Sequence, residues 1–250
     1  MPFLQRLRLM RNWLKPSRPS RQHGFAYRLG WWIGRAIVAF VVGSVLMTLL
    51  YKFVPPPLTI TMLIDRNGFS KQWEPLSRID RNMVAAVIAG EDGRFCAHNG
   101  FDRSAIERAI QRNAQSTRLR GGSTISQQTA KNAFLWQGTG WTRYARKALE
   151  AWFTFLIENI WGKRRIMEIY LNVAETGIGT YGVEAGAQRY YHHSAARLNP
   201  VEAARIAAAL PSPKKRAVVD ASGFTLRHGN SIAARSRVVR VSALDGCVYN

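Results

Sequence analysis

One apolar stretch near the amino terminus constrains the fold more than any other feature of this chain. Residues 31–54 read WWIGRAIVAFVVGSVLMTLLYKFV, and their only charged members, Arg35 and Lys52, lie toward the two ends. About 20 apolar residues cross the roughly 30 Å hydrocarbon core of a bilayer, and cations near either end can reach the headgroups. Trp31 and Trp32 match the aromatic belt at membrane interfaces. We therefore predict a single transmembrane helix over residues 31–54.

The charge before this stretch predicts the orientation of the helix. Residues 1–30 contain no acidic residue and seven cations, which are Arg6, Arg8, Arg11, Lys15, Arg18, Arg21 and Arg28. Because positive charge is retained on the cytoplasmic side, we expect the amino terminus inside and everything after Pro55 outside. A cleaved signal peptide and a buried core helix are the alternatives. The run is longer than the roughly 7–15 apolar residues of a signal peptide, and three prolines follow it instead of a small-residue cleavage site.

The overall charge restricts the partners. The formal net charge of +21 favours polyanions, which include nucleic acid, anionic lipid headgroups and phosphorylated substrates. A domain outside the cytoplasmic membrane meets lipid phosphates and envelope polymers before it meets nucleic acid. We therefore expect contact with the membrane and no nucleic-acid partner.

The two cysteines, Cys96 and Cys247, leave their redox state open. They lack a metal-binding spacing such as CxxC, so neither a zinc site nor a disulfide framework is predicted. A single bridge between them is compatible with an oxidising compartment, but sequence carries no distance that would decide it.

After Pro55 the hydrophobic pattern is mostly helical. Residues 58–78 read as a short strand and loop, with the apolar TITMLI run before a turn-like Asp-Arg-Asn-Gly. Apolar residues then recur at helical spacing, after a possible cap at Asp80, in six segments: 83–88, 106–110, 125–135, 144–160, 166–173 and 200–210. We predict a mainly α domain over residues 55–213 and a weakly organised tail of unknown role over residues 214–250.

A candidate catalytic carboxylate ends the first of these helices. Glu91 lies three and four residues past Ile88 and Val87, so it continues their buried face at the carboxyl end of the helix. Burial and the negative end of the helix dipole both raise the pKa of a carboxyl, which suits a general acid or base near neutral pH. The alternative is a solvated Glu-Asp pair at a fraying helix end.

A second polar segment, GGSTISQQTAKN over residues 121–132, has features of an anion site. Thr124 and Gln127 have the spacing of a capping box that begins a helix, and the paired glycines allow close backbone approach. Free backbone amides at the helix start and Lys131 one turn in could bind phosphate. The GxxxxGK[ST] pattern of a nucleotide-binding loop is absent. A capped helix facing solvent is the alternative.

A third pair, Arg146 and Glu150, lies one helical turn apart and would ordinarily be a surface ion pair. The chain already offers Glu91 and Lys131, so this pair adds a second carboxylate and another cation. Two carboxylates whose roles are separated by environment recur in glycosyl chemistry.

Five strings, in this order, closely resemble the five motifs of the peptidoglycan glycosyltransferase domain: EDGRFCAHNGFD, GGSTISQQTAKN, RKALE, KRRIMEIYLNVAETGIGTYGVEAGAQRYY and LNPVEAARIAAALPSP. That domain occurs alone in monofunctional biosynthetic transglycosylases and at the amino end of bifunctional penicillin-binding proteins. The resemblance covers residues 58–213 and implies a lysozyme-like, mainly helical, bilobed fold with its cleft above the bilayer. Residues 212–215 fit the SxxK motif of penicillin-binding active sites. The accompanying SDN and KTG motifs are absent, so a penicillin-binding site is not expected.

The resemblance also implies roles for individual residues. It makes Glu91 the general base and Glu150 the second essential carboxylate, and it assigns the donor's pyrophosphate to Lys131 and Arg146. The substrate-cleft motif contains Gln127, Ser123 and Thr124. The fourth motif, which is more structural, contains Glu168, Tyr170 and Asn172. Two residues match the first motif without a clear role: Asp92 and His98.

The expected reaction is polymerisation of lipid II at the cytoplasmic (inner) membrane. The 4-hydroxyl of the acceptor GlcNAc attacks the anomeric carbon of the donor MurNAc, forms a β-1,4 linkage with inversion and releases polyprenyl pyrophosphate. Expected partners are lipid II, the growing lipid-linked glycan strand and the membrane, with cell-wall synthases or division proteins as further candidates. No cofactor is certain, although the resemblance allows a divalent cation (Mg) held by Glu150, and no metal-ligand residues are predicted.

Two other functions use the same features differently. A lytic transglycosylase or lysozyme-like hydrolase would cut glycan strands with one acidic residue and would need no pyrophosphate site. A non-enzymatic, membrane-anchored envelope scaffold would use the basic surface and would leave the paired glutamates unexplained. Lys131, Arg146 and the membrane anchor favour synthesis over cleavage.

Overall fold

The computed structural model describes residues 24–114, 122–138 and 140–249. Residues 1–23, which belong to the predicted cytoplasmic segment, and Gly121 of the second motif lie outside the described residues. The chain divides into two compact units, Met1–Met47 and Thr48–Asn250.

Helix α2, Phe25–Phe53, supplies the described part of the first unit and reaches the start of the second. Apolar side chains such as Ile37 cover it on all sides and are exposed, which suits a lipid environment. The guanidinium of Arg35 lies over the ring of Trp31, 4.7 Å from its centroid. The helix is long and apolar enough to cross a membrane, and it contains nearly all of the predicted span over residues 31–54.

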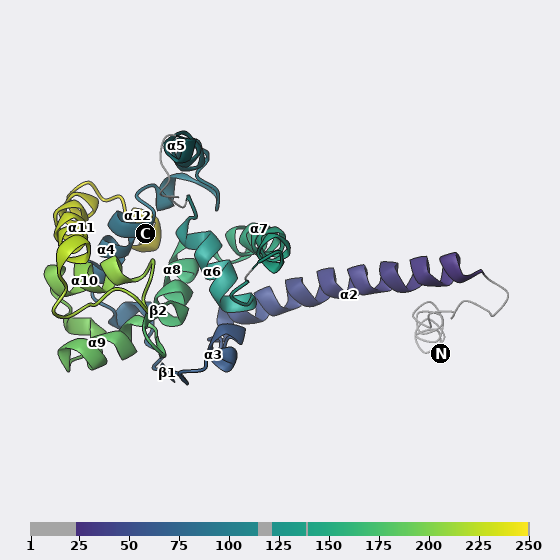
Figure 1. The fold of residues 1–250 in the computed structure, drawn as a ribbon, viewed down its shortest axis with the longest axis horizontal. Coiled ribbons are helices and arrows are strands. Elements are labelled where there is room, and N and C mark those ends of the chain that lie inside the picture. The colour runs from purple at the N-terminus through teal and green to yellow at the C-terminus, as the bar shows by residue number, and fades with distance from the viewer. Residues whose placement is uncertain (1–23, 115–121, 139, 250) are drawn as a thin grey trace, which may run out of the picture. The chain divides into compact units, whose positions relative to one another are not determined.

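The second unit is mainly helical (Figure 1). Its α-helices are α3 (Ile60–Ile64), α4 (Arg81–Glu91), α5 (Arg103–Ala114), α6 (Ile125–Phe134), α7 (Thr142–Ile160), α8 (Gly162–Val173), α9 (Val183–Tyr191), α10 (Pro200–Ala209), α11 (Gly223–Val241) and α12 (Gly246–Tyr249). Short 3-10 turns are η1 (Leu76–Arg78), η2 (Phe95–Ala97) and η3 (Ala195–Arg197). The prediction of a mainly helical domain behind an apolar amino-terminal helix is confirmed.

Two groups of helices make the core. Helices α4, α10 and α11 pack against one another, and α6 packs against both α7 and α8 (Figure 1). Helix α4 begins where the side chain of Asp80 accepts a hydrogen bond from the backbone N–H of Asn82, as the sequence predicts. All six residues from Met83 to Ile88 are fully buried. The carboxyl end of α4, which carries Glu91, is therefore held by the core of the first group.

A small three-stranded sheet joins distant parts of the chain. Strand β1 (Ser70–Lys71) pairs in parallel with β3 (Thr180–Tyr181), and β3 pairs antiparallel with β2 (Glu175–Gly177). A Cβ atom on Gly177 would lie 1.8 Å from the hydroxyl oxygen of Tyr190, so a larger residue would displace the Tyr190 side chain. The sheet thus ties the segment after α3 to the segment before α9.

The TITMLI run does not form the predicted strand. Its residues form the short helix α3, and the side chain of Thr59 caps it by accepting a hydrogen bond from the N–H of Met62 over 3.3 Å. The helix packs against α6 and buries Thr61 and Met62. A short apolar run has no reliable period, so this tertiary contact decides its conformation.

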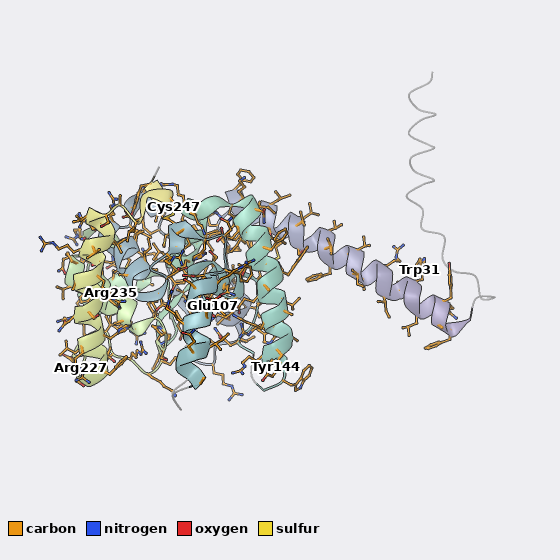
Figure 2. All side chains as sticks on the ribbon, turned by 90° about the horizontal axis from the view of Figure 1, so that it is seen from above. Trp31, Glu107, Tyr144, Arg227, Arg235 and Cys247 are labelled. Atoms are coloured by element: carbon orange, nitrogen blue, oxygen red, sulfur yellow. A yellow bond between two sulfur atoms is a disulfide. The ribbon has the colours of Figure 1, made fainter. Side chains whose placement is uncertain are left out.

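The tail after residue 213 is organised, contrary to prediction. Helix α11 packs against α4 and α10, and it buries Gly229, Ile232, Ser236 and Val239 at helical spacing. Two of these four residues are small, so the apolar periodicity in the sequence is weak. The outer face of α11 carries exposed arginines, among them Arg227 and Arg235 (Figure 2).

Candidate active site

Glu91, the last residue of α4, lines a cavity of about 370 Å³. The side-chain Nε2 of Gln128 donates a hydrogen bond to its Oε2 over 2.8 Å. Burial raises the pKa of the Glu91 carboxyl and outweighs the opposing effects of the Gln128 hydrogen bond and of the positive charges of Arg216 and Lys131. The direction agrees with the prediction from sequence and suits proton transfer near neutral pH.

A second carboxylate and three cations line the same cavity: Glu150, Lys131, Arg146 and Lys147. Nη1 of Arg146 donates to Oε2 of Glu150 over 2.6 Å, and Nζ of Lys147 pairs with the other carboxylate oxygen. Burial lowers the pKa of the Lys131 amine, although the charge of Glu150 opposes that effect. The structure thus brings together four of the predicted site residues, Glu91, Lys131, Arg146 and Glu150.

Arg146 retains a buried hydrogen-bond donor for a ligand. Its Nε has no hydrogen-bond partner among the described residues, although Nη1 is paired with Glu150. The absence of a side chain at Gly138 leaves room beside Nε of Arg146. A Cβ atom on residue 138 would lie 3.1 Å from that Nε and crowd it. A buried N–H of a charged group is unfavourable when unpaired, and an anion in the cavity would satisfy it.

The three remaining predicted binding residues lie around the start of α6. Thr124 and Gln127 form the predicted capping box, and Thr124 Oγ1 also donates to the carbonyl of Gly100 over 2.6 Å. Both side chains are buried in these contacts, so the structure uses them to begin α6. Ser123 lines the cavity with Glu91, and its hydroxyl accepts a hydrogen bond from Lys147 over 3.2 Å.

Gln128 belongs to the site, although the predicted site residues do not include it. It contacts Glu91, and its carbonyl oxygen accepts a hydrogen bond from the hydroxyl of Tyr170 over 3.4 Å. The available signal was spacing, because Gln128 and Lys131 are three residues apart and share one face of α6. Lys131, which was predicted, therefore pointed to Gln128 rather than to Gln127.

A larger cavity of about 670 Å³ adjoins the first, and the two share Gln128, Lys131 and Pro211 in their walls. Ile64 of α3 lines it, and so does Lys214. The amine of Lys214 pairs with Asp65 at 2.8 Å and with Glu175 at 3.5 Å, which joins the loop after α3 to the segment after α10. The site therefore has two connected compartments, and the smaller one contains Glu91 and Glu150.

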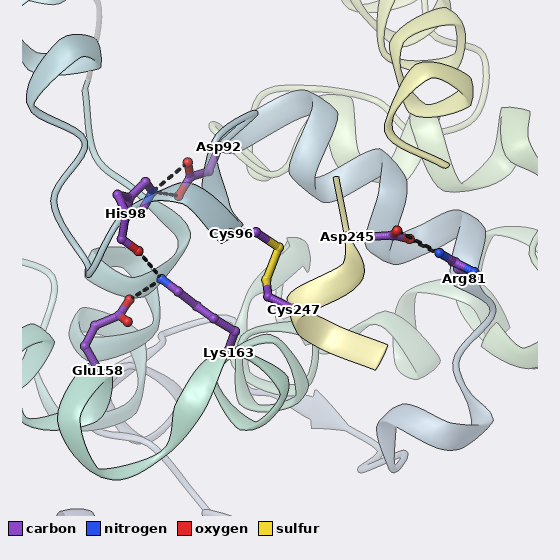
Figure 3. The surroundings of a disulfide bond; sticks show 8 residues. All are labelled: Arg81, Asp92, Cys96, His98, Glu158, Lys163, Asp245 and Cys247. Atoms are coloured by element: carbon purple, nitrogen blue, oxygen red, sulfur yellow. Dashed lines mark hydrogen bonds and ion pairs between the residues drawn. A yellow bond between two sulfur atoms is a disulfide. The ribbon is translucent and has the colours of Figure 1, made fainter. Parts of the chain in front are cut away.

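The carboxylate of Asp92 points toward His98 and joins two functional segments (Figure 3). Its carboxylate oxygens both lie 3.0 Å from Nε2 of His98, and one of them accepts a hydrogen bond from the backbone N–H of Ile125 over 3.1 Å. Ile125 is the first residue of α6. Asp92 therefore ties the end of α4 to the start of the helix that carries Gln128 and Lys131.

The fourth motif is structural, as the resemblance implies. Oε1 of Glu168 accepts a hydrogen bond from the N–H of Leu76 over 3.0 Å. Asn172 accepts from the N–H of Glu74 over 2.8 Å and donates to its carbonyl over 2.8 Å. Both side chains hold the segment before α4. Tyr170 is fully buried beneath Gln128, and burial raises the pKa of its phenol well above the usual value.

Cys96 and Cys247 form a disulfide, with their Cα atoms 5.5 Å apart (Figure 3). This answers the question that the sequence left open. The bond links η2, which lies within the first motif, to the carboxyl-terminal helix α12.

The described residues do not form a resident metal site. Within residues 24–114, 122–138 and 140–249, no three His, Cys, Asp or Glu side chains cluster in a way that could hold an ion. Both carboxylate oxygens of Glu150, the residue at which the resemblance allows a divalent cation, are engaged by Arg146 and Lys147.

Comparison with known proteins identifies the family. A family model described as "Transglycosylase" matches residues 59–239. Proteins named "Biosynthetic peptidoglycan transglycosylase" are 46% identical in Caulobacter vibrioides, over 84% of this chain and 92% of the relative, and 46% identical in Bdellovibrio bacteriovorus, over 88% and 90%. One from Pseudomonas putida is 42% identical, over 87% and 92%. The buried glutamate beside a cluster of cations thus belongs to a peptidoglycan glycosyltransferase, and the chain is a member of the biosynthetic peptidoglycan transglycosylase family.

Proposed function

We propose that this glycosyltransferase polymerises lipid II with Glu91 as the general base. One observation carries the proposal: a buried carboxyl, held by Gln128, lines the same cavity as Lys131 and Arg146. The reaction needs a proton acceptor for the incoming hydroxyl and positive charge for the departing pyrophosphate. This cavity offers both.

Glu91 takes the proton from the 4-hydroxyl of the acceptor GlcNAc as that oxygen attacks the anomeric carbon of the donor MurNAc. The bond from that carbon to the polyprenyl pyrophosphate breaks, and the α-linked donor becomes a β-1,4-linked product. The raised pKa of Glu91 supports this role because proton transfer is most efficient when the pKa of the base approaches the working pH.

Lys131 and Arg146 stabilise the negative charge that develops on the leaving pyrophosphate. Burial of both side chains supports this role, because charge interactions strengthen where water is excluded. The unpaired Nε of Arg146 adds a donor, and Glu150 orients the guanidinium that carries it. A guanidinium suits phosphate oxygens because its planar N–H groups can bind two of them at once.

The two connected cavities suit a reaction between two sugar substrates. The smaller cavity, with Lys131, Arg146 and Glu150, would hold the donor's pyrophosphate, and the larger one would hold the acceptor. Gln128 lines both cavities, and Glu91 lies beside it in the smaller one. A strand-cutting enzyme would need no cationic compartment, so this arrangement supports synthesis.

The enzyme works at the outer face of the cytoplasmic membrane in this proposal. Helix α2 would be the single-pass anchor, and the seven cations before it would keep the amino terminus inside. The disulfide supports the assignment, because such bonds persist in oxidising compartments and are rare in the cytoplasm. Reporter fusions at the two ends of the chain test the topology, and a cytoplasmic carboxyl terminus would contradict it. Cell-wall synthases or division proteins remain candidate partners.

The direct test is an assay of the detergent-solubilised full chain on labelled lipid II. Formation of a polymer that lysozyme digests is the expected result, and purified sacculi serve as a second substrate. Release of soluble muropeptides from sacculi, with no polymer from lipid II, would replace the proposal with a lytic function.

A further inference from the structure

A covalent bond joins the catalytic loop to a segment beyond the part of the chain that matches the family. The catalytic loop, Glu91–His98, contains Cys96, and the terminal turn, Asp245–Tyr249, contains Cys247 (Figure 3). The family match ends at residue 239. The other half of this disulfide is therefore supplied by a segment that the family model does not include.

Noncovalent contacts hold the terminal turn to the rest of the domain. Nε and Nη2 of Arg81 donate to the two carboxylate oxygens of Asp245, each over 2.7 Å, and Asp245 is fully buried. The same guanidinium lies over the ring of Tyr249, 4.8 Å from its centroid. Arg164 of α8 donates to the carbonyl of Val248 over 3.1 Å. The turn is thus fixed both to the start of α4 and to α8.

The catalytic loop also has noncovalent anchors of its own, and two of them involve His98. Nζ of Lys163 donates to the carbonyl of His98 over 2.6 Å and pairs with Glu158 at 2.7 Å. The Asp92 carboxylate contacts the ring of His98 and the backbone N–H of Ile125. Motion of this loop therefore moves the residue next to Glu91 and the contact that sets the start of α6.

We propose that the terminal turn is a positioning element for the catalytic loop and acts through the Cys96–Cys247 disulfide. The bond fixes the backbone of the loop five residues after Glu91, while Arg81 and Asp245 fix the turn to the other end of the same helix, α4. Both ends of α4 are thereby connected to one rigid segment. A group displaced by about 1 Å can lower a rate by on the order of 100-fold, so a device that restrains the loop affects turnover.

The proposal rests on Glu91 as the general base and predicts an effect on kcat rather than on KM. The cations assigned to the pyrophosphate lie on α6 and α7, outside the loop and the turn. Release of the loop should therefore lower kcat by on the order of 10- to 100-fold and leave KM for lipid II within about twofold.

The experiment compares the full chain in detergent, oxidised and reduced, with Cys247→Ser. Reduction by dithiothreitol adds two electrons and two protons to the two sulfurs, which become thiols, and dithiothreitol closes to its cyclic disulfide. Reduced wild type and oxidised Cys247→Ser should lose kcat by the same factor, and reduction of Cys247→Ser should change nothing more. Wild type and Cys247→Ser are each assayed well below their melting temperatures.

Val183→Ala is the matched stability control, because Val183 is buried and belongs to α9, which packs against the sheet and η3. It should lower the melting temperature and keep kcat. An equal loss of kcat in Val183→Ala, or an unchanged kcat in reduced wild type, would overturn the proposal.

If Cys247→Ser does not fold, Asp245→Asn provides the second test, because it weakens the contact with Arg81 and leaves the disulfide intact. Failure of wild type to polymerise lipid II would instead contradict the proposed function.

Discussion

The side-chain amide of Gln128 donates a hydrogen bond to the carboxylate of Glu91 over 2.8 Å and accepts one from the hydroxyl of Tyr170 over 3.4 Å. Glu91 ends α4, and Gln128 lies in the first turn of α6, so the two helix groups of the domain meet at the Glu91 carboxyl. Burial raises the pKa of Glu91, and this hydrogen bond limits the rise. Gln128 is therefore expected to set the pH range in which the base is ionised.

Gln128→Ala should move the acid limb of the pH–rate profile to higher pH. Loss of the hydrogen bond removes an effect that favours the charged carboxylate, so the pKa of Glu91 rises further. A hydrogen bond to a charged group contributes about 1.5–3 kcal/mol, which corresponds to a shift of roughly one to two pH units. The measurement is kcat/KM for lipid II from mildly acidic to mildly alkaline pH.

Gln127→Ala is the matched control for this shift. Gln127 belongs to the cap of α6, so its loss should lower the melting temperature and leave the acid limb in place. An unmoved limb in Gln128→Ala would show that the contact with Glu91 does not tune the base.

Glu91→Gln should abolish polymerisation while lipid II binding and the circular dichroism spectrum stay close to wild type. The amide keeps the size of the side chain but cannot accept a proton, and general-base catalysis typically contributes about 10²–10⁴-fold. Binding is followed with fluorescent lipid II and turnover by gel analysis of the polymer. A variant that keeps most of its activity would direct attention to Asp92 or Glu150 as the base.

In the proposed mechanism both cations act where the pyrophosphate charge develops, so Lys131→Ala and Arg146→Ala should each reduce polymerisation strongly. Arg146→Lys should also be impaired, since an ammonium cannot make the two-pronged contact of a guanidinium with phosphate oxygens. Arg235→Ala, on the exposed face of α11, is the control for loss of one positive charge and should keep its activity. Activity on sacculi that is undiminished in the cavity variants, without polymer from lipid II, would contradict synthesis.

Asp65→Asn should reduce the loss of stability in acid. Burial pushes the pKa of Asp65 up, but hydrogen bonds from Lys214, Tyr181 and Asn67 outweigh it and hold the pKa well below its usual range. A depressed folded-state pKa stabilises the protein above the unfolded value of about 3.9, and that contribution is lost as the pH falls toward the folded value.

The measurement for Asp65 is the melting temperature of the full chain in detergent, from neutral pH downward. Wild type should lose more stability than Asp65→Asn across the acid range. Asp220→Asn is the control and should follow wild type. Asp220 is exposed, and asparagine tolerates the positive φ of its backbone. Parallel curves for wild type and Asp65→Asn would contradict the assignment.

The features that depend on residues a few positions apart were readable from the sequence. The apolar span, the Asp80 cap and the Thr124–Gln127 capping box all follow from local spacing, and the structure agrees with each. Local spacing suffices because helix periodicity and capping are set within one or two turns. The order of the five motifs also indicated the family before any tertiary contact was known.

The features that depend on distant residues were decided by tertiary structure alone. Gln128 and Glu91 are 37 positions apart, and Cys96 and Cys247 are 151 apart, so neither pairing leaves a local pattern. Helix α11 buries small residues, whose weak apolar period hides it until α4 and α10 cover them. Sequence determined which side chains could do the chemistry. Packing determined which of them meet, because burial and distance arise only when separate elements close around one core.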